Sequence, residues 1–197
     1  MIAKGGKGNT KIGPGVFTFS MTAGPESVGG TCPGASDWCA AHCYAMRLTR
    51  YTSVRDRFSE NADATRAGMM PEIPAKARSY RIHVSGDFHS AEYVEAWRTV
   101  VRSRPEVHFY AYTRSWRVPE IVSALESLRA EPNMQLFASV DASIAELPPS
   151  DWRVAYIDGD PRFTGIDCPE QTGRKANCEE CGYCIRGKRG NVNFSTH

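Results

Sequence analysis

Hydrophobic and polar side chains alternate in several short stretches of this chain, which is the pattern of β-strands with one buried face. In residues 15–22, Phe17, Phe19 and Met21 fall on one face, and threonine or serine falls on the other. The same period of two predicts five further strands, at residues 81–87, 107–114, 134–141, 153–158 and 192–197.

Segments with apolar residues at helical spacing separate most of these strands. We expect one helix at residues 54–68, a second that Ser90 caps and Pro105 ends, and a third that Pro119 opens. Strands and helices therefore alternate along the chain, which is typical of a largely parallel sheet.

Each predicted strand has an apolar face and a mixed polar face. In residues 81–87, Ile82 and Val84 share one face, and the residues between them take the other. The carboxyl ends of the predicted strands carry polar residues, namely Asp87, Arg114, Asp141, Asp158 and His197. This favours an α/β fold built as a TIM-like partial barrel, with about six parallel strands, outer helices and a site at the strand ends. The plainer alternative is that these are ordinary polar residues leading into loops.

Length and composition suit a single domain, residues 1–197, because 41% of its residues are hydrophobic. Residues 1–15 are rich in glycine and lysine and form a loose lead-in, and residues 161–190 form a cysteine-rich loop. The 24 basic and 22 acidic residues give a net charge of +2, which neither favours nor excludes a nucleic-acid partner. No stretch resembles a signal peptide or a membrane span, so we expect no membrane association.

Three of the seven cysteines, Cys32, Cys39 and Cys43, follow the first strand. Residues 38–50 contain no glycine or proline and come after the capping residue Ser36, so one helix is expected there. Such a helix places Cys39 and Cys43 on one face. Three thiolates at a helix start are typical of a soft metal site for iron–sulfur, zinc or Cu(I). The alternative is buried cysteines that pack as small hydrophobic side chains, whereas a disulfide fits one helical turn poorly.

The other four cysteines form a second group, in which Cys178, Cys181 and Cys184 are evenly spaced and Cys168 precedes a proline. The ferredoxin-type run has the same C-x₂-C-x₂-C core and a fourth cysteine before proline, so we favour iron–sulfur over zinc here. Basic residues flank this group, namely Arg174, Lys175, Arg186, Lys188 and Arg189. These charges are either solvated, or offset the negative charge of a cluster, or contact phosphate.

Four segments together resemble a known family. They are residues 31–45 with Thr-Cys-Pro-Gly-Ala and Cys-x-x-x-Cys-Tyr-Ala, residues 83–88 with His-Val-Ser-Gly-Asp-Phe, residues 112–116 with Tyr-Thr-Arg-Ser-Trp, and residues 168–173 with Cys-Pro-Glu-Gln-Thr-Gly. This combination resembles the phage proteins called the gene product 88 family, over about Thr31 to Cys184. The resemblance implies a phage protein that acts in the cytoplasm of the infected host cell.

The layout is more distantly similar to the radical S-adenosylmethionine enzymes, whose core is a six-stranded partial barrel. In those enzymes three cysteines after the first strand hold a [4Fe–4S] cluster with one open iron, and a Gly-Gly-Glu-type motif holds the amino group of S-adenosylmethionine. This similarity assigns that second role to Ser85, Gly86 and Asp87. The cysteine spacing differs, because this chain has C-x₆-C-x₃-C where those enzymes have C-x₃-C-x₂-C.

Three functions follow as hypotheses. The first is an enzyme in which the open iron of a [4Fe–4S] cluster acts on a small charged ligand such as S-adenosylmethionine. Tyr112 would bind that ligand, and Asp87, Arg114 and Asp141 would be catalytic residues. A [3Fe–4S] cluster is the alternative cluster type. A purely structural salt bridge between Arg114 and Asp141 is the alternative for that pair. The second is a regulatory module whose clusters are structural or redox-sensing and whose partner is a host protein or nucleic acid. The third is a zinc protein with no redox role.

Overall fold

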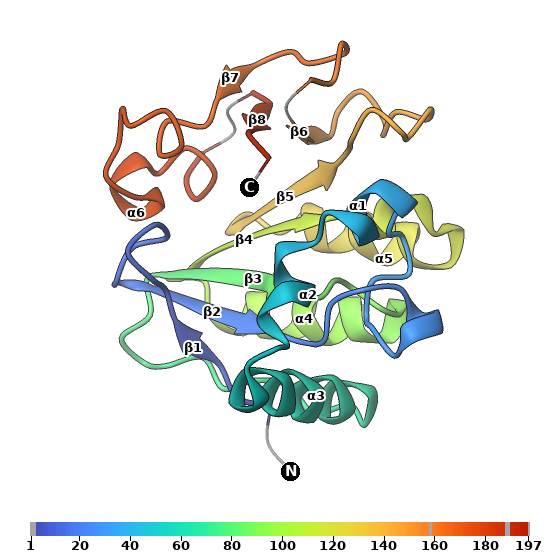
Figure 1. The fold of residues 1–197 in the computed structure, drawn as a ribbon. Coiled ribbons are helices and arrows are strands. Elements are labelled where there is room, and N and C mark those ends of the chain that lie inside the picture. The colour runs from blue at the N-terminus through green and yellow to red at the C-terminus, as the bar shows by residue number, and fades with distance from the viewer. Residues whose placement is uncertain (1–2, 158, 188–189, 197) are drawn as a thin grey trace.

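The computed structural model describes residues 3–157, 159–187 and 190–196, and an eight-stranded sheet forms its centre (Figure 1). The strand order is β1-β2-β3-β4-β5-β6-β8-β7, and among the described strands only β1 and β2 pair antiparallel. The strands are β1 (Gly6–Lys7), β2 (Val16–Ser20), β3 (Ser79–Ser85), β4 (His108–Thr113), β5 (Met134–Ser139), β6 (Arg153–Ile157), β7 (Ile166–Asp167) and β8 (Val192–Phe194).

The six strands predicted from alternation correspond to β2, β3, β4, β5, β6 and β8, so a mostly parallel α/β sheet is confirmed. The pattern does not predict β1 and β7, because two residues are too few to show a period. These two strands are the free edges, and no pairing among the described residues closes the sheet. The TIM-like part of the prediction is therefore not confirmed. The predicted strand-end residues Asp158 and His197, and the flanking Lys188 and Arg189, lie outside the described residues.

Three longer helices, α3 (Thr52–Arg66), α4 (Ala91–Ser103) and α5 (Pro119–Arg129), pack around the sheet, and α4 lies beside α5 (Figure 1). Ser90 caps α4 as predicted, because its Oγ accepts a hydrogen bond from the Tyr93 amide at 3.2 Å. The shorter helical elements are η1 (Glu26–Val28), α1 (Asp37–Ala41), α2 (Tyr44–Leu48), η2 (Ser115–Arg117) and α6 (Cys178–Cys181). Within the described part of the chain, none of the helices has the length and apolar character needed to cross a membrane.

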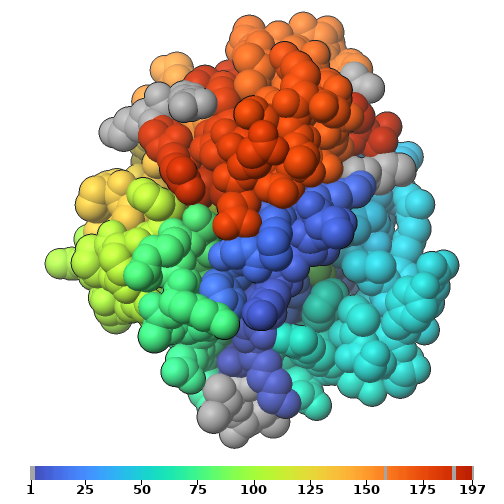
Figure 2. Space-filling model, turned by 90° about the vertical axis from the view of Figure 1, so that its left-hand side faces the viewer, coloured from blue at the N-terminus to red at the C-terminus, as the bar shows by residue number. Residues whose placement is uncertain are grey.

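Both faces of the sheet are covered by hydrophobic packing, so the mixed polar face that alternation predicts is only partly present. One face packs on α4 and α5, where Phe19, Phe109 and Leu136 meet Trp97 and Leu125 in the main hydrophobic core. We call the opposite side the inner face. Its side chains include Arg81, Tyr110, Tyr112, Phe137 and Ala155. The C-terminal segment covers part of the inner face, and Figure 2 shows that segment lying against the N-terminal residues.

A bulge in β3 corrects the predicted alternation of residues 81–87. Thr18 of β2 pairs with Arg81 and Ser20 pairs with Ser85, so β3 has two extra residues between these pairs. His83 lies in this interval with a left-handed φ of 63°. Ile82 and Val84 therefore do not share a face: Ile82 joins the main core, and Val84 packs toward the inner face.

Candidate functional site

The first cysteine loop joins β2 to α1 and lies on the carboxyl end of the sheet. Within the loop, the Cys32 amide donates to the Gly24 carbonyl at 3.0 Å. Gly34 lies so close to Arg114 that a β-carbon at this position would collide with the Arg114 carbonyl oxygen. Only glycine permits this approach, so the loop is held directly against the residue that follows β4.

The two cysteines that follow do not share one helix. Ser36 caps α1 as predicted, because its Oγ accepts from the Cys39 amide at 3.0 Å. Cys43, however, is extended, with φ −68° and ψ 107°, and it separates α1 from α2 as the N-cap of the latter. The prediction of one continuous helix over residues 38–50 is therefore wrong.

Tertiary contacts explain the break at Cys43. The Tyr44 hydroxyl donates to the Val84 carbonyl at 2.6 Å, and Ala45 is buried, so α2 is drawn onto β3. Helix propensity, which depends on local residues alone, does not contain this information.

The three strand-end residues predicted to be catalytic contact one another beneath the cysteine loop. Both Asp87 oxygens accept backbone hydrogen bonds, from Phe88 at 2.8 Å and from Arg114 at 2.7 Å. Arg114 Nη1 donates to Asp141 Oδ2 at 2.5 Å, and both side chains are buried. Ser36 Oγ donates to the same Asp141 oxygen at 2.8 Å, so one carboxylate connects the cysteine loop to Arg114. Arg114 and Asp141 thus form a buried salt bridge.

Burial and neighbouring charge act on the groups around this loop. Burial raises the pKa of the Cys32 thiol, and the Asp87 carboxylate raises it further. Burial also raises the pKa of Cys39, which the Arg114 guanidinium opposes. Burial opposes ionisation of Asp141, but hydrogen bonds from Ser143 and Ser36 and the Arg114 charge outweigh it, so its pKa lies below the ordinary value. The first cysteines and the strand-end residues therefore share one electrostatic environment.

The predicted cofactor-binding residues have local partners. Ser85 Oγ donates to the Met21 carbonyl at 2.7 Å. Gly86 has a φ of +85°, and a β-carbon on it would lie 2.6 Å from Thr31 Oγ1, so this position holds the loop closely. Tyr112 lies on the inner face against Phe137.

The second cysteine group forms where α6, β7 and β8 meet the inner face. Asn177 caps α6 by accepting from the Glu180 amide at 2.8 Å, and the Cys178 amide donates to the Lys11 carbonyl at 2.9 Å. The Cys168 amide donates to the Asn193 carbonyl at 2.9 Å, which ties the residue after β7 to β8. Cys184 packs in one hydrophobic cluster with Cys168 and in another with Cys178, so the fold brings Cys168 near the C-x₂-C-x₂-C run.

Two arginines flank this group on the inner face. The Arg81 guanidinium lies 5.1 Å from the centre of the Tyr112 ring, and its charge acts on the Cys178 thiol. The Arg153 guanidinium lies 4.0 Å from the centre of the Phe137 ring, and its charge acts on Cys184. Burial raises the pKa of Cys178 to about 11 and that of Cys184 to about 12, against these two cations.

All seven cysteines are free thiols, and Cys168 is the most buried of them. In the described part of the chain, no three His, Cys, Asp or Glu side chains are already arranged around a point where they could hold a metal ion. The sulfurs of each group are thus neighbours without being in coordination geometry.

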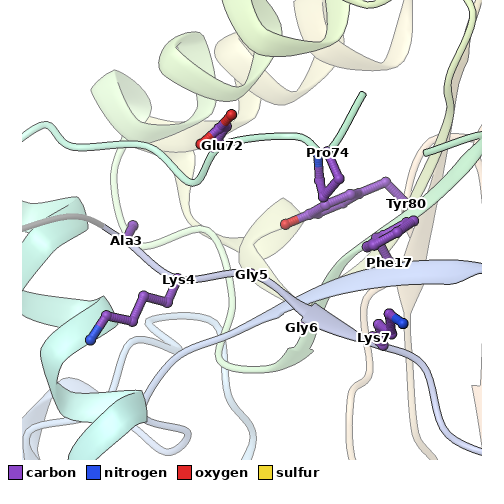
Figure 3. Close-up of a pocket in the computed structure, with 9 residues that line it drawn as sticks. All are labelled: Ala3, Lys4, Gly5, Gly6, Lys7, Phe17, Glu72, Pro74 and Tyr80. Atoms are coloured by element: carbon purple, nitrogen blue, oxygen red, sulfur yellow. The ribbon is translucent and has the colours of Figure 1, made fainter. Parts of the chain in front are cut away.

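Two cavities lie away from the cysteines. One of about 400 Å³ lies beside β1, where Figure 3 shows Tyr80 and Phe17 near the N-terminal backbone. The Tyr80 hydroxyl is buried and has no hydrogen-bond partner among the described residues. A second cavity, of about 220 Å³, lies between α3 and the start of α4 and includes His89. Neither cavity is lined by a residue of the predicted site.

A family model described as Gene product 88 matches residues 2–187. The chain belongs to the Gene product 88 family. It is 32% identical to the "Gene 88 protein" of Mycobacterium phage L5 over 226 aligned positions, which cover 95% of this chain and 91% of the relative. It is 30% identical to the "Gene 88 protein" of Mycobacterium phage D29, with the same coverage. No solved structure matches this Gene product 88 protein significantly.

Sequence reasoning missed several residues of the site in this Gene product 88 protein. Arg81 and Arg153 occupy inner-face positions, which alternation places but to which it assigns no role. Arg162 donates to the Asp141 carbonyl at 2.9 Å and pairs with the buried Asp160 at 2.7 Å, which braces the turn after β5. The sequence shows this last pair only as Asp-Pro-Arg in a loop, and that tripeptide does not indicate which turn the arginine stabilises.

Proposed function

We propose that this Gene product 88 protein is an iron–sulfur cluster-binding protein of a phage, with the C-terminal cysteines Cys168, Cys178, Cys181 and Cys184 as one site. What supports the proposal most is that Cys184 of a C-x₂-C-x₂-C run packs in one cluster with Cys168 and in another with Cys178. Four free cysteine thiols are the ligand set of [2Fe–2S] and [4Fe–4S] clusters. Zinc with four cysteines is the alternative at this site.

We propose Cys32, Cys39 and Cys43 as the ligands of a second cluster, [4Fe–4S] or [3Fe–4S], at the carboxyl end of the strands. Three cysteines leave one iron of a four-iron cluster without a protein sulfur. Because neither set of cysteines is already arranged around an ion, the loops would close further on binding. Metal binding and ordering of these loops would then be thermodynamically coupled, as they are in other small metal sites.

In this proposal the strand-end residues position the first cysteine loop. Asp141 binds both Ser36 and Arg114, while Asp87 accepts from two backbone amides. These hydrogen bonds hold the three side chains against protein partners. S-adenosylmethionine or another small charged ligand would bind in addition to them, because a carboxylate has about four acceptor sites. A redox-sensing or structural role for the clusters, with a host protein or nucleic acid as partner, fits this arrangement better than a radical enzyme.

Anaerobic purification, followed by iron, sulfide and zinc analysis and by visible and EPR spectroscopy, tests the proposal. We expect iron, acid-labile sulfide and thiolate-to-iron absorbance. Cys39→Ser and Cys181→Ser should each remove part of this absorbance, and the two losses should be additive because the two residues belong to different clusters. Ser103→Ala, a change at an exposed helix end, serves as the handling control. Zinc without sulfide would replace the cluster by a zinc site, and a chain free of both metals would refute the proposal.

A further inference from the structure

Arg81 is a partly buried cation without an anionic partner. Within the described part of the chain, no carboxylate lies at ion-pair distance from its guanidinium. Its protein contacts are a hydrogen bond from Nε to the His83 carbonyl at 3.3 Å and the face of Tyr112. A charge removed from water in this way is unfavourable unless an opposite charge compensates it.

The Arg81 guanidinium lies over the Tyr112 ring, and Tyr112 packs in one cluster with Tyr110, Cys178 and Cys184. None of these neighbours is a carboxylate. Metal coordination supplies the missing negative charge, because a cysteine binds a metal as its thiolate.

We infer that Arg81 is the counter-charge that the inner face provides for a metal–thiolate centre at Cys178 and its three partner cysteines. This inference rests on the function proposed above and adds a residue outside the cysteine motifs. A centre with four thiolate ligands carries net negative charge, and Arg81 of β3 lies over Tyr112, which packs in one cluster with Cys178 and Cys184. Arg81 is a positioning residue here, since it acts through its charge on the ligands.

If Arg81 is a counter-charge, Arg81→Met should lower the thermal midpoint of the metal-loaded protein but not that of the metal-free protein, whereas loss of a merely structural arginine should lower both. Arg81→Met removes the uncompensated charge from the metal-free protein, so its thermal midpoint stays equal or rises. The same change removes the compensating charge from the metal-loaded protein, so its midpoint falls. The apparent Kd for Co²⁺, used as a spectroscopic probe of thiolate sites, should rise about tenfold or more, because a unit charge nearby in a partly buried site is worth at least that factor.

The experiment compares wild type, Arg81→Met, Arg81→Lys and Arg104→Met as full-length reduced chains. Each is melted metal-free and after anaerobic loading with iron and sulfide, and each is titrated with Co²⁺. Arg81→Lys keeps the charge and should keep most of the metal-dependent gain. Arg104 holds the Ile73 and Pro74 carbonyls far from the cysteines, so Arg104→Met should lower both midpoints equally.

Two failures are distinguishable. Three results for Arg81→Met would overturn the role of Arg81 while the proposed function stands. They are an equal fall of the metal-free and metal-loaded thermal midpoints, an unchanged Kd for Co²⁺, and folding only in the presence of metal. A wild-type chain that gains no stability from iron and sulfide and gives no thiolate–Co²⁺ band would overturn the proposed function, and the inference with it.

Discussion

Replacing Asp141 by asparagine tests whether the strand-end residues hold the first cysteine loop. The change keeps the shape of the side chain and removes its charge. Asp141 is 1% exposed, and its Oδ2 accepts from Arg114 at 2.5 Å and from Ser36 at 2.8 Å. Its Oδ1 accepts from the Ser143 amide at 2.9 Å. Asparagine offers one oxygen for these donors and leaves the buried Arg114 guanidinium without a counter-charge.

The expected loss of unfolding free energy for Asp141→Asn is about 3–5 kcal/mol, the usual cost of removing one partner of a buried ion pair. The Arg114→Met/Asp141→Asn double variant should recover much of this, because no unpaired charge then remains. Glu60→Gln is the matched surface control. Glu60 pairs with Lys4 at 3.5 Å with both side chains more than half exposed, so the loss there should stay below about 1 kcal/mol.

Urea unfolding of the reduced, metal-free chain measures these differences, with an unchanged slope expected. The pKa of folded Asp141 lies below its ordinary value, so the unfolded chain binds the proton first as pH falls. The stabilisation by ionised Asp141 is therefore complete above about pH 4 and is lost as pH falls through the lower folded value. A loss for Asp141→Asn below about 1 kcal/mol at pH 7, or one independent of pH, would refute this reasoning.

Two further changes test other parts of the site. Gly34→Ala should lower the free energy of unfolding by about 1–3 kcal/mol in the same urea assay, because the new methyl group meets the Arg114 backbone, which cannot move aside. A loss below about 0.5 kcal/mol would contradict this packing. Burial lowers the pKa of His83 to about 3, so the wild-type protein should lose stability as pH falls from about 6.5. The His83→Asn variant should lose less stability over the same pH range, and asparagine tolerates the left-handed φ at this position. His89, whose pKa burial lowers to about 4, contributes to both proteins, and equal slopes would exclude His83 as a source.

The strands and long helices were predictable because their signals are local. Alternation in residues 15–22, the Ser90 cap and Pro119 at a helix start each depend on near neighbours, and each appears in the structure as expected. Strand order then follows from alternation of strands and helices, which places the ends of β3, β4 and β5 side by side. This is why Asp87 and Arg114 could be expected to meet.

The parts that could not be predicted depend on contacts between distant residues. Nothing local breaks the helix at Cys43, which is set by α2 docking on Val84. The bulge at His83 arises in a stretch that reads as regular alternation. The sequence likewise does not indicate whether Arg114 binds a ligand or a carboxylate of the protein; in the structure it binds Asp141.

The bulge gives β3 contacts with both cysteine groups. Before His83, Arg81 lies over Tyr112, which packs in one cluster with Cys178. After His83, Val84 accepts the hydrogen bond from Tyr44, the residue after Cys43. In a regular strand His83 would share the face of Arg81, whereas its left-handed φ turns the imidazole into the core beside Tyr93. A non-glycine residue in this conformation costs about 1–3 kcal/mol, and such strain persists where the surrounding structure requires it. The strained residue therefore separates the two segments of β3 that face the two cysteine groups.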